Sequence, residues 1–312
     1  MSAPTLSARA WGLLLLLSLL WGGSFLFVGI AVREVPPMTL VLARVGIGGA
    51  ALLALLRLRG EALPRGGAAW RDMAGMAVLM SALPFCLIVW GQAHIPAGLA
   101  AILNATTPLF GALVAHVATQ DERLTPLRCA ALGAGFSGVV VLMGGPAAGH
   151  AGVQGWAVLA CLAASLSYGI GGVFGRRVRR HGLTPLAAAS MQVGIAAILL
   201  APLALAMDRP WGLAIPSATA IAAVLALALL STALAYLVLF RIMALAGPGN
   251  ALLVTFLIPP SAILLGWLGL GESLLPRHLA GMALIGLGLV LLDGRWRRVP
   301  VASGVLPPDA LG

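Results

Sequence analysis

Charged residues are scarce in this chain. Only 9% of its 312 residues are Asp, Glu, Lys or Arg, and lysine is absent altogether, whereas soluble domains carry about 25% charged residues. Hydrophobic residues make up 61% of the chain, and the mean hydropathy is +1.04. So little polar surface excludes an ordinary soluble protein and predicts an integral membrane protein.

Residues suited to catalysis or metal binding are also few and scattered. The three cysteines, Cys86, Cys129 and Cys161, fall in apolar stretches and show no metal-ligand spacing. The five histidines are isolated in the sequence, and no carboxylate falls inside an apolar stretch, where a proton relay commonly keeps one. We therefore expect no metal, no cofactor and no enzymatic activity.

The apolar residues gather in stretches of about 17–25 residues, long enough to cross a hydrocarbon core of about 30 Å. Strand-like alternation is absent, and a helix satisfies its own backbone polar groups in lipid. The sequence therefore predicts an all-α integral membrane protein. The predicted spans are residues 11–32, 37–56, 73–93, 97–119, 127–145, 153–175, 185–206, 217–243, 248–270 and 277–292.

The arginines are distributed unevenly between the predicted loops. With the amino terminus inside, 15 of the 19 arginines fall on the cytoplasmic side, and only Arg33, Arg209 and Arg277 fall on the other. This positive-inside pattern predicts that both termini are cytoplasmic. It also explains the basic clusters at 57–71 and 176–180 by topology, so we expect no nucleic acid partner.

Short loops and arginine-only basic usage favour a bacterial plasma (inner) membrane. The expected partners are the lipid bilayer and a small-molecule substrate, and a homodimer is left open.

A long internal repeat runs through the chain. The segment RVGI at 44–47 reappears as QVGI at 192–195, Ser81 matches Ser231 at a spacing of 150, and residues 122–142 match 272–292 at the same spacing. Each copy holds five predicted spans, an odd number, so the second copy enters the bilayer inverted. We predict a first repeat at 1–148, a second, inverted repeat at 149–298 and a C-terminal tail at 299–312.

These features together resemble a known family. The segment WGGS at 21–24, the 37–44 segment that opens the second span, mid-span prolines and the Glu-x-Leu-x-Pro elements at 122–126 and 272–276 are similar to an EamA-type member of the drug/metabolite transporter superfamily. The resemblance covers about residues 10–293. It implies ten transmembrane helices in two inverted five-helix repeats around a central cavity, commonly in an exporter of amino acids or other small metabolites.

Two prolines predict interruptions of their spans. Pro108 lacks the N–H that would bond the carbonyl of Asn104, and Pro259 likewise frees the carbonyl of Thr255. Transporter sites commonly use such broken helices. We expect Asn104, Thr107 and Thr255 to bind substrate; the alternatives are that they bond neighbouring helices, or that the prolines only bend the spans.

Arg44 is the only charged side chain that we place well inside a span. It follows Pro37 by seven residues, roughly 10 Å at 1.5 Å per residue. A charge there costs about 2.5–3.5 kcal/mol on insertion scales, which favours a partner or a wet cavity. We expect Arg44 and its neutral repeat mate Gln192 to line a substrate site, with Arg44 attracting a carboxylate or phosphate. The alternative is that Arg44 snorkels to the outer interface and meets Glu34.

Aromatic residues within spans are further candidates for the substrate site. Trp21 matches Tyr168 at a spacing of 147, and Trp90 and Tyr236 also lie inside spans. They are expected to enclose an apolar part of the solute, or alternatively to pack between helices.

Two glutamates and one histidine are considered for roles other than substrate binding. Glu122 and Glu272 each precede Leu-x-Pro, where a carboxylate favours the start of the following helix through its dipole. His116 is left open as a coupling residue.

The function predicted from these residues is alternating-access transport, with export of small organic metabolites such as amino acids or drug-like solutes. One alternative is a sugar-phosphate or nucleotide-sugar exchanger, which should show more basic residues lining the cavity than Arg44 alone. The alternative from another class is a membrane-embedded lipid-modifying enzyme or scaffold, which needs clustered catalytic groups near one face.

Overall fold

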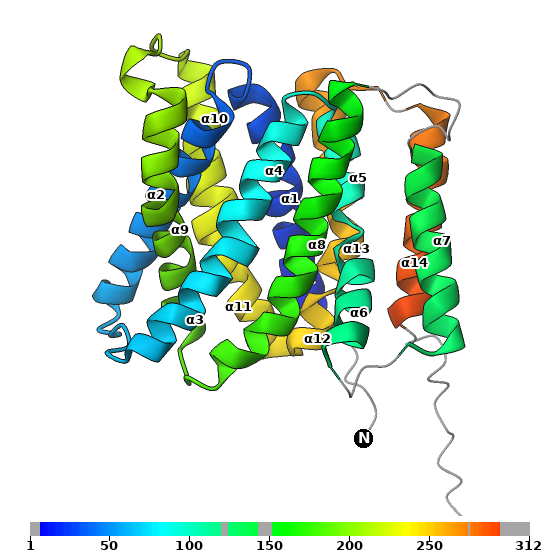
Figure 1. The fold of residues 1–312 in the computed structure, drawn as a ribbon, viewed down its shortest axis with the longest axis horizontal. Helices are drawn as coiled ribbons and strands as arrows, with labels where there is room; N and C mark the ends of the chain where they lie inside the picture. Colours follow the sequence, from blue (N-terminus) through cyan, green and yellow to red (C-terminus); the bar gives the residue numbers. More distant parts are fainter. Residues whose placement is uncertain (1–6, 120–123, 143–151, 274, 294–312) are drawn as a thin grey trace, which may run out of the picture.

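The computed structural model describes residues 7–119, 124–142, 152–273 and 275–293, so Glu122 and the tail at 299–312 lie outside the described residues. Within those ranges the regular structure is helical and no strand is found, as predicted. Figure 1 shows the long helices running side by side.

The first part of the chain provides five helical segments. They are α1 (Ala8–Ala31), α2 (Pro37–Leu58), α3 (Gly67–Ala77) continuing through the π-helix η1 (Val78–Ala82) into α4 (Leu83–Gln92), α5 (Ala97–Asn104) followed by α6 (Thr107–Ala118), and α7 (Pro126–Leu142).

The second part repeats this order. Its segments are α8 (Val153–Arg179), α9 (Pro185–Asp208), the short 3-10 helix η3 (Pro210–Gly212), α10 (Ala218–Ala228) continuing through the π-helix η4 (Leu229–Leu234) into α11 (Ala235–Ala246), α12 (Pro248–Ala251), α13 (Val254–Leu270) and α14 (Pro276–Asp293).

Within the described residues, every predicted span coincides with helical structure. Seven segments are long and apolar enough to cross a bilayer, and three further apolar helices, Pro126–Leu142, Val254–Leu270 and Pro276–Leu292, are shorter. The chain is therefore a multi-pass membrane protein.

Local sequence explains where helices begin. The hydroxyls of Ser7, Thr184 and Ser217 accept the N–H of the residue three positions on, which satisfies an unpaired donor in the first turn of α1, α9 and α10. Pro37 and Pro185 occupy the first positions of α2 and α9, where a missing N–H costs nothing.

The two π-helices lie near the middle of their spans. In a π-helix the N–H of one residue bonds the carbonyl five positions earlier, and Pro84 has no N–H to offer Leu79. Ser167 of α8 donates to the Leu79 carbonyl instead, at 2.8 Å. In η4 the Thr232 hydroxyl donates to the Leu227 carbonyl at 3.0 Å. Single-turn π segments frequently occur at functional sites.

The predicted interruption at the proline is found in the first half of the chain but not in the second. In the first half, the span that contains Pro108 is interrupted at Ala105–Thr106, just before the proline, as expected. In the second half Pro259 lies inside α13, which continues through it, and the interruption falls earlier, at Leu252–Leu253. A proline removes one hydrogen bond and bends a helix, but neighbouring packing can keep the helix continuous.

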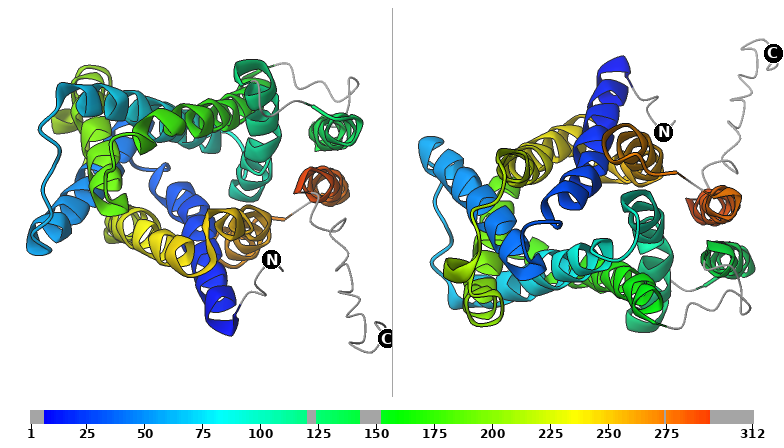
Figure 2. Two further views of the ribbon diagram at one scale, coloured as in Figure 1. Left: turned by 90° about the horizontal axis from the view of Figure 1, so that it is seen from below. Right: turned by 90° about the horizontal axis from the view of Figure 1, so that it is seen from above.

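The helices form a ring and one separate pair. In the end-on views of Figure 2, α7 and α14 lie side by side outside the ring formed by the other helices. Glycines let this pair approach closely, because a Cβ on Gly288 would stand 2.6 Å from the carbonyl oxygen of Ala131.

Helices α2 and α9 also pack against each other and are tied at both ends. The Asp208 carboxylate accepts hydrogen bonds from the Thr39 N–H at 2.7 Å and from its hydroxyl at 2.9 Å, while Thr184 donates to Glu61. Each carboxylate meets the positive end of the facing helix. This antiparallel pair carries Arg44 and Gln192, and so fixes their positions relative to each other.

Candidate functional site

Arg44 is held inside the protein by two contacts from other helices. The residue is only 7% exposed, its Nε donates to the Thr232 hydroxyl of η4 at 3.1 Å, and its guanidinium carbon lies 3.7 Å from the ring centroid of Phe85 of α4. The second contact is a cation–π interaction. Arg44 therefore does not reach Glu34, whose carboxylate instead accepts from the backbone and hydroxyl of Ser217.

The guanidinium is incompletely satisfied. It carries five N–H donors, and within the described residues only the one on Nε has an acceptor. The residue also forms no ion pair with any carboxylate whose side chain the structure describes. The two terminal nitrogens, which form the fork that binds a carboxylate in bidentate fashion, therefore have no partner in this part of the chain.

Gln192 occupies the corresponding place on α9 and is differently satisfied. Its Nε2 donates to the Ser81 hydroxyl of η1 at 2.9 Å and to the Tyr236 hydroxyl of α11 at 2.8 Å, so both of its N–H groups are used. The residue is 7% exposed, like Arg44. Its surroundings are neutral and hydrogen-bonded.

The two sets of contacts cross between the halves of the chain. Arg44, from the first half, contacts the π segment of the second, and Gln192, from the second half, contacts the π segment of the first. We call the residues Arg44, Ser81, Phe85, Gln192, Thr232 and Tyr236 the polar cluster. Because it joins helices of both halves near mid-span, a movement of one half against the other must change it.

One of the predicted aromatic residues belongs to this cluster. Tyr236 belongs to it through its hydrogen bond with Gln192. Tyr168 packs against both hydrophobic cores of the protein. Trp21 packs against one core only, and Trp90 is 37% exposed and stacks near His94. The structure thus places Tyr236 in the polar cluster and shows no such contact for the tryptophans among the described residues.

The residues predicted from the proline breaks make contacts of their own. The Thr107 hydroxyl donates to the Asn104 carbonyl at 2.7 Å, which is the carbonyl that Pro108 leaves free. Thr255 lines an apolar cleft of about 220 Å³ together with Pro259, and residues of α5 and α14 complete the walls. The side-chain oxygen of Asn104 is buried without a partner among the described residues.

The predicted role of Glu272 needs correction. Its two carboxylate oxygens accept from the backbone N–H groups of Ala97, at 2.7 Å, and Gly98, at 3.1 Å, so it caps α5 of the other half rather than the helix that follows it. Gly271 adopts a left-handed turn with φ of 67°, which directs the chain after α13 toward α5. His116 accepts from the Leu124 N–H and holds the end of α6, a structural contact.

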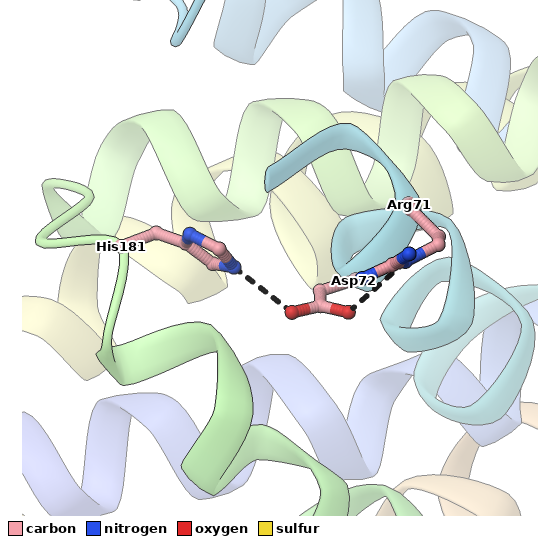
Figure 3. A network of polar contacts seen from close by, with 3 residues as sticks. All are labelled: Arg71, Asp72 and His181. Atoms are coloured by element: carbon pink, nitrogen blue, oxygen red, sulfur yellow. Dashed lines mark hydrogen bonds and ion pairs between the residues drawn. The ribbon is translucent and has the colours of Figure 1, made fainter. Parts of the chain in front are cut away.

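A second type of polar contact lies at the two ends of the helix ring, which we call its rims. Figure 3 shows Asp72 of α3 between His181, whose Nε2 lies 2.9 Å from one carboxylate oxygen, and Arg71, at 3.9 Å from the other. His181 follows α8 just as Glu34 follows α1, and Glu34 likewise reaches the start of the third span of the other half, at Ser217. Both rims are therefore tied by equivalent loops with different chemistry.

Sequence reasoning missed four residues that the structure places at or beside the cluster: Ser81, Phe85, Ser231 and Thr232. The matched pair of serines was a usable signal, since polar residues at equivalent mid-span positions of both copies are costly in lipid. Nothing local in the sequence indicates the π-helix that turns Thr232 toward Arg44.

The comparisons with known proteins decide the family. The model of the EamA-like transporter family matches residues 9–144 and again 155–292. The chain belongs to this family. Because the family is one of transporters, membership decides against the membrane enzyme.

Curated relatives cover most of the EamA-like chain. A probable terminal-alkyne amino-acid exporter of Streptantibioticus cattleyicolor is 29% identical, with 93% of this chain and 95% of the relative covered. An uncharacterised inner membrane transporter of Escherichia coli, YedA, is 27% identical over 86% and 84%. A probable amino-acid metabolite efflux pump of Salmonella typhimurium is 28% identical over 94% and 98%.

A solved crystal structure shares the fold. It superposes with a TM-score of 0.65 at 21% identity and covers 93% of this chain and 99% of the other.

Proposed function

We propose that this protein is an alternating-access carrier that exports small organic metabolites, such as amino acids or related solutes, across a bacterial inner membrane. The polar cluster carries this proposal. It gathers hydrogen-bonding groups from both halves of the chain at mid-span, where a buried charge or amide is costly and is usually retained for function.

The proposed architecture is two inverted five-helix repeats with both termini in the cytoplasm. Its support is the double match of the family model and the crossed contacts of Arg44 and Gln192 with the opposite π segments. In such a carrier the site stays near the midplane while one repeat rocks against the other. The Asp72–His181 and Glu34–Ser217 contacts at the two rims would then open alternately.

The relatives named as an amino-acid exporter and an amino-acid metabolite efflux pump support small metabolites as cargo. A sugar-phosphate exchanger is a weaker proposal, because Arg44 is the only arginine among the buried residues of the described chain.

Solute flux in vesicles tests carriage. The purified protein in sealed vesicles should move labelled amino acids in a saturable way without changing them, and Gln192→Leu should lower the rate at least tenfold because it removes both hydrogen bonds of that half. Asn104→Ala provides the comparison at the proline break. Flux that does not saturate, or a chemically altered product, contradicts carriage.

Thiol labelling tests alternating access. In a variant without its three native cysteines, Ser81→Cys should react with a membrane-impermeant reagent from either side of the membrane, in separate experiments. Reaction from one side only, with and without solute, contradicts the mechanism.

A further inference from the structure

The Arg44 half of the polar cluster has unused donors in excess of acceptors. The guanidinium's terminal nitrogens have no described acceptor, although the residue is only 7% exposed. Ser231, next to Thr232 in η4, is 1% exposed, and its hydroxyl has no hydrogen-bond partner among the described residues. A buried hydroxyl left unpaired, such as that of Ser231, destabilises the protein unless a ligand supplies an acceptor.

The repeat relation places Ser231 on the Arg44 side. Its mate Ser81 bonds Gln192, and Gln192 is the mate of Arg44. Thr232 already bonds the Nε of Arg44, so η4 approaches the guanidinium at this turn. A cationic fork and an adjacent hydroxyl are the donors that a carboxylate accepts.

Among the side chains that the structure describes, no carboxylate is available to complete this half or to pair with an amino group. The five carboxylates whose side chains the structure describes are engaged at helix ends or rims; they are Glu34, Glu61, Asp72, Asp208 and Glu272. The face of the Phe85 ring is occupied by Arg44 itself. A substrate ammonium near Arg44 would meet a positive charge without a compensating negative one.

The remaining neighbours are aromatic. Phe85 of α4 lies against Arg44, Tyr236 of α11 accepts from Gln192 in the same cluster, and Tyr168 of α8 packs against both hydrophobic cores. Flat apolar faces with a few convergent polar groups suit a compact organic body carrying one polar head.

We propose that Arg44, Ser231 and Thr232 bind the carboxylate of a net-anionic organic solute with an aromatic or apolar body, and that this site has no carboxylate to pair with an amino substituent. This inference rests on the proposed transport function and deepens it. It predicts that this chain prefers such an anion to the corresponding free amino acid, because a zwitterion presents an ammonium beside its carboxylate.

Four probes with one phenylpropyl body test the inference: 3-phenylpropionate, L-phenylalanine, 3-phenylpropionamide and L-phenylalaninamide. Each is added to the purified full-length protein, and the shift of the thermal unfolding midpoint is measured over a concentration series. We expect 3-phenylpropionate to bind about tenfold more tightly than phenylalanine, and neither amide to shift the midpoint. Equal or tighter binding of phenylalanine, or no shift with any probe up to its solubility limit, overturns the inference.

Variants separate the groups. Arg44→Gln should abolish the preference for the acid over its amide, while Arg44→Lys should keep a reduced preference, because an ammonium supplies charge without the fork. Ser231→Ala should weaken binding of the acid about tenfold, which corresponds to one charge-assisted hydrogen bond of about 1.4 kcal/mol. The matched control is Ser190→Ala, a buried serine on α9 whose hydroxyl bonds the Leu186 carbonyl of its own helix.

The control also guards against misfolding. If Ser231→Ala lowers the midpoint without ligand no more than Ser190→Ala but loses acid binding, the hydroxyl acts on the ligand. If acid binding survives in both Ser231→Ala and Arg44→Gln, the inference is wrong. Saturable vesicle flux of other solutes by the wild type would in that case leave the proposed transport function standing, whereas failure of all flux would contradict the function itself.

Discussion

The Arg44 and Gln192 halves of the polar cluster occupy equivalent places and differ in how completely they are satisfied. Gln192 uses both N–H groups of its amide on Ser81 and Tyr236, whereas Arg44 uses one donor of five on Thr232 and rests on a ring. Ser81 is bonded and its mate Ser231 has no partner among the described residues. The difference indicates that the hydrogen bonds of Gln192 hold the helices together, whereas the Arg44 half has hydrogen-bond donors that lack an acceptor.

Placing a second cation in the neutral half should have the largest effect. Gln192→Arg puts two guanidiniums in a cluster with no described carboxylate, so the free energy of unfolding should fall by about 3 kcal/mol, the scale for a charge in mid-membrane. Denaturant titration of the purified protein measures the loss.

The exchange of both residues provides the control. Arg44→Gln combined with Gln192→Arg restores a single charge, and Ser81 and Tyr236 can accept from it in place of Thr232. The double variant should regain at least half of the lost stability. If it is as unstable as Gln192→Arg alone, the two halves are not equivalent in the way proposed here.

The all-helical fold and the positions of its spans were predictable because lipid leaves the backbone little choice. Long apolar stretches, first-turn prolines such as Pro37 and Pro185, and N-caps such as Thr184 are local signals, and the structure places helices where they predict them. The interruption before Val254 was placed wrongly from Pro259, because tertiary packing carries α13 through that proline.

The site was predicted only where its residues are unusual for a membrane. Arg44 and Gln192 are conspicuous in any apolar span, and the two tyrosines are the only ones in the chain. Phe85 and Thr232 are ordinary span residues, and their contact with Arg44 depends on the facing of α4 and on the extra residue per turn in η4. Such orientation arises from long-range packing, which single-residue patterns do not encode.

Gly48 of α2 provides the next test of the comparison, with a smaller expected effect on stability. A Cβ on Gly48 would lie 3.0 Å from the Ala228 carbonyl oxygen and 3.1 Å from the Thr232 methyl, whereas nothing lies within 4 Å of the same point on Gly46. Alanine gains about 1 kcal/mol of helix propensity over glycine, but overpacking costs about 1–3 kcal/mol.

We therefore expect Gly48→Ala to be about 1–3 kcal/mol less stable than Gly46→Ala and to weaken the contact of Arg44 with η4. The repeat mate of Gly48 is Ala196, so the Gln192 half already accommodates this methyl group. Denaturant titration of the two variants decides the question, and equal stabilities would mean that η4 moves freely away from α2.

Removing the Phe85 ring, which lies against Arg44, should have a smaller effect on stability. Phe85→Leu keeps an apolar side chain but removes the cation–π contact, which contributes about 0.5–2 kcal/mol when desolvated. A double-mutant cycle of Phe85→Leu and Arg44→Gln isolates the pair, and we expect a coupling energy of about 1 kcal/mol. The mate of Phe85 is Ala235, so Ala235→Leu combined with Gln192→Leu is the matched cycle and should show no comparable coupling. Equal coupling in both cycles contradicts a specific role for the ring.

The smallest effect concerns the two rims, where the halves also differ. Hydrogen bonds from the Ser217 backbone N–H and hydroxyl lower the pKa of Glu34 below its ordinary value of 4.5. A carboxyl group whose pKa is lower in the folded state stabilises the protein fully above its unfolded pKa, and this contribution is lost as the pH falls through the folded pKa. Glu34→Gln should therefore lower the thermal midpoint slightly and by a constant amount at neutral pH, and the difference from the wild type should shrink as the pH falls below 4.5. Asp72→Asn, which cuts the His181 contact at the other rim, is the paired variant. A Glu34→Gln difference that stays constant down to the lowest pH at which the protein remains folded would show that the carboxylate charge does not hold that rim.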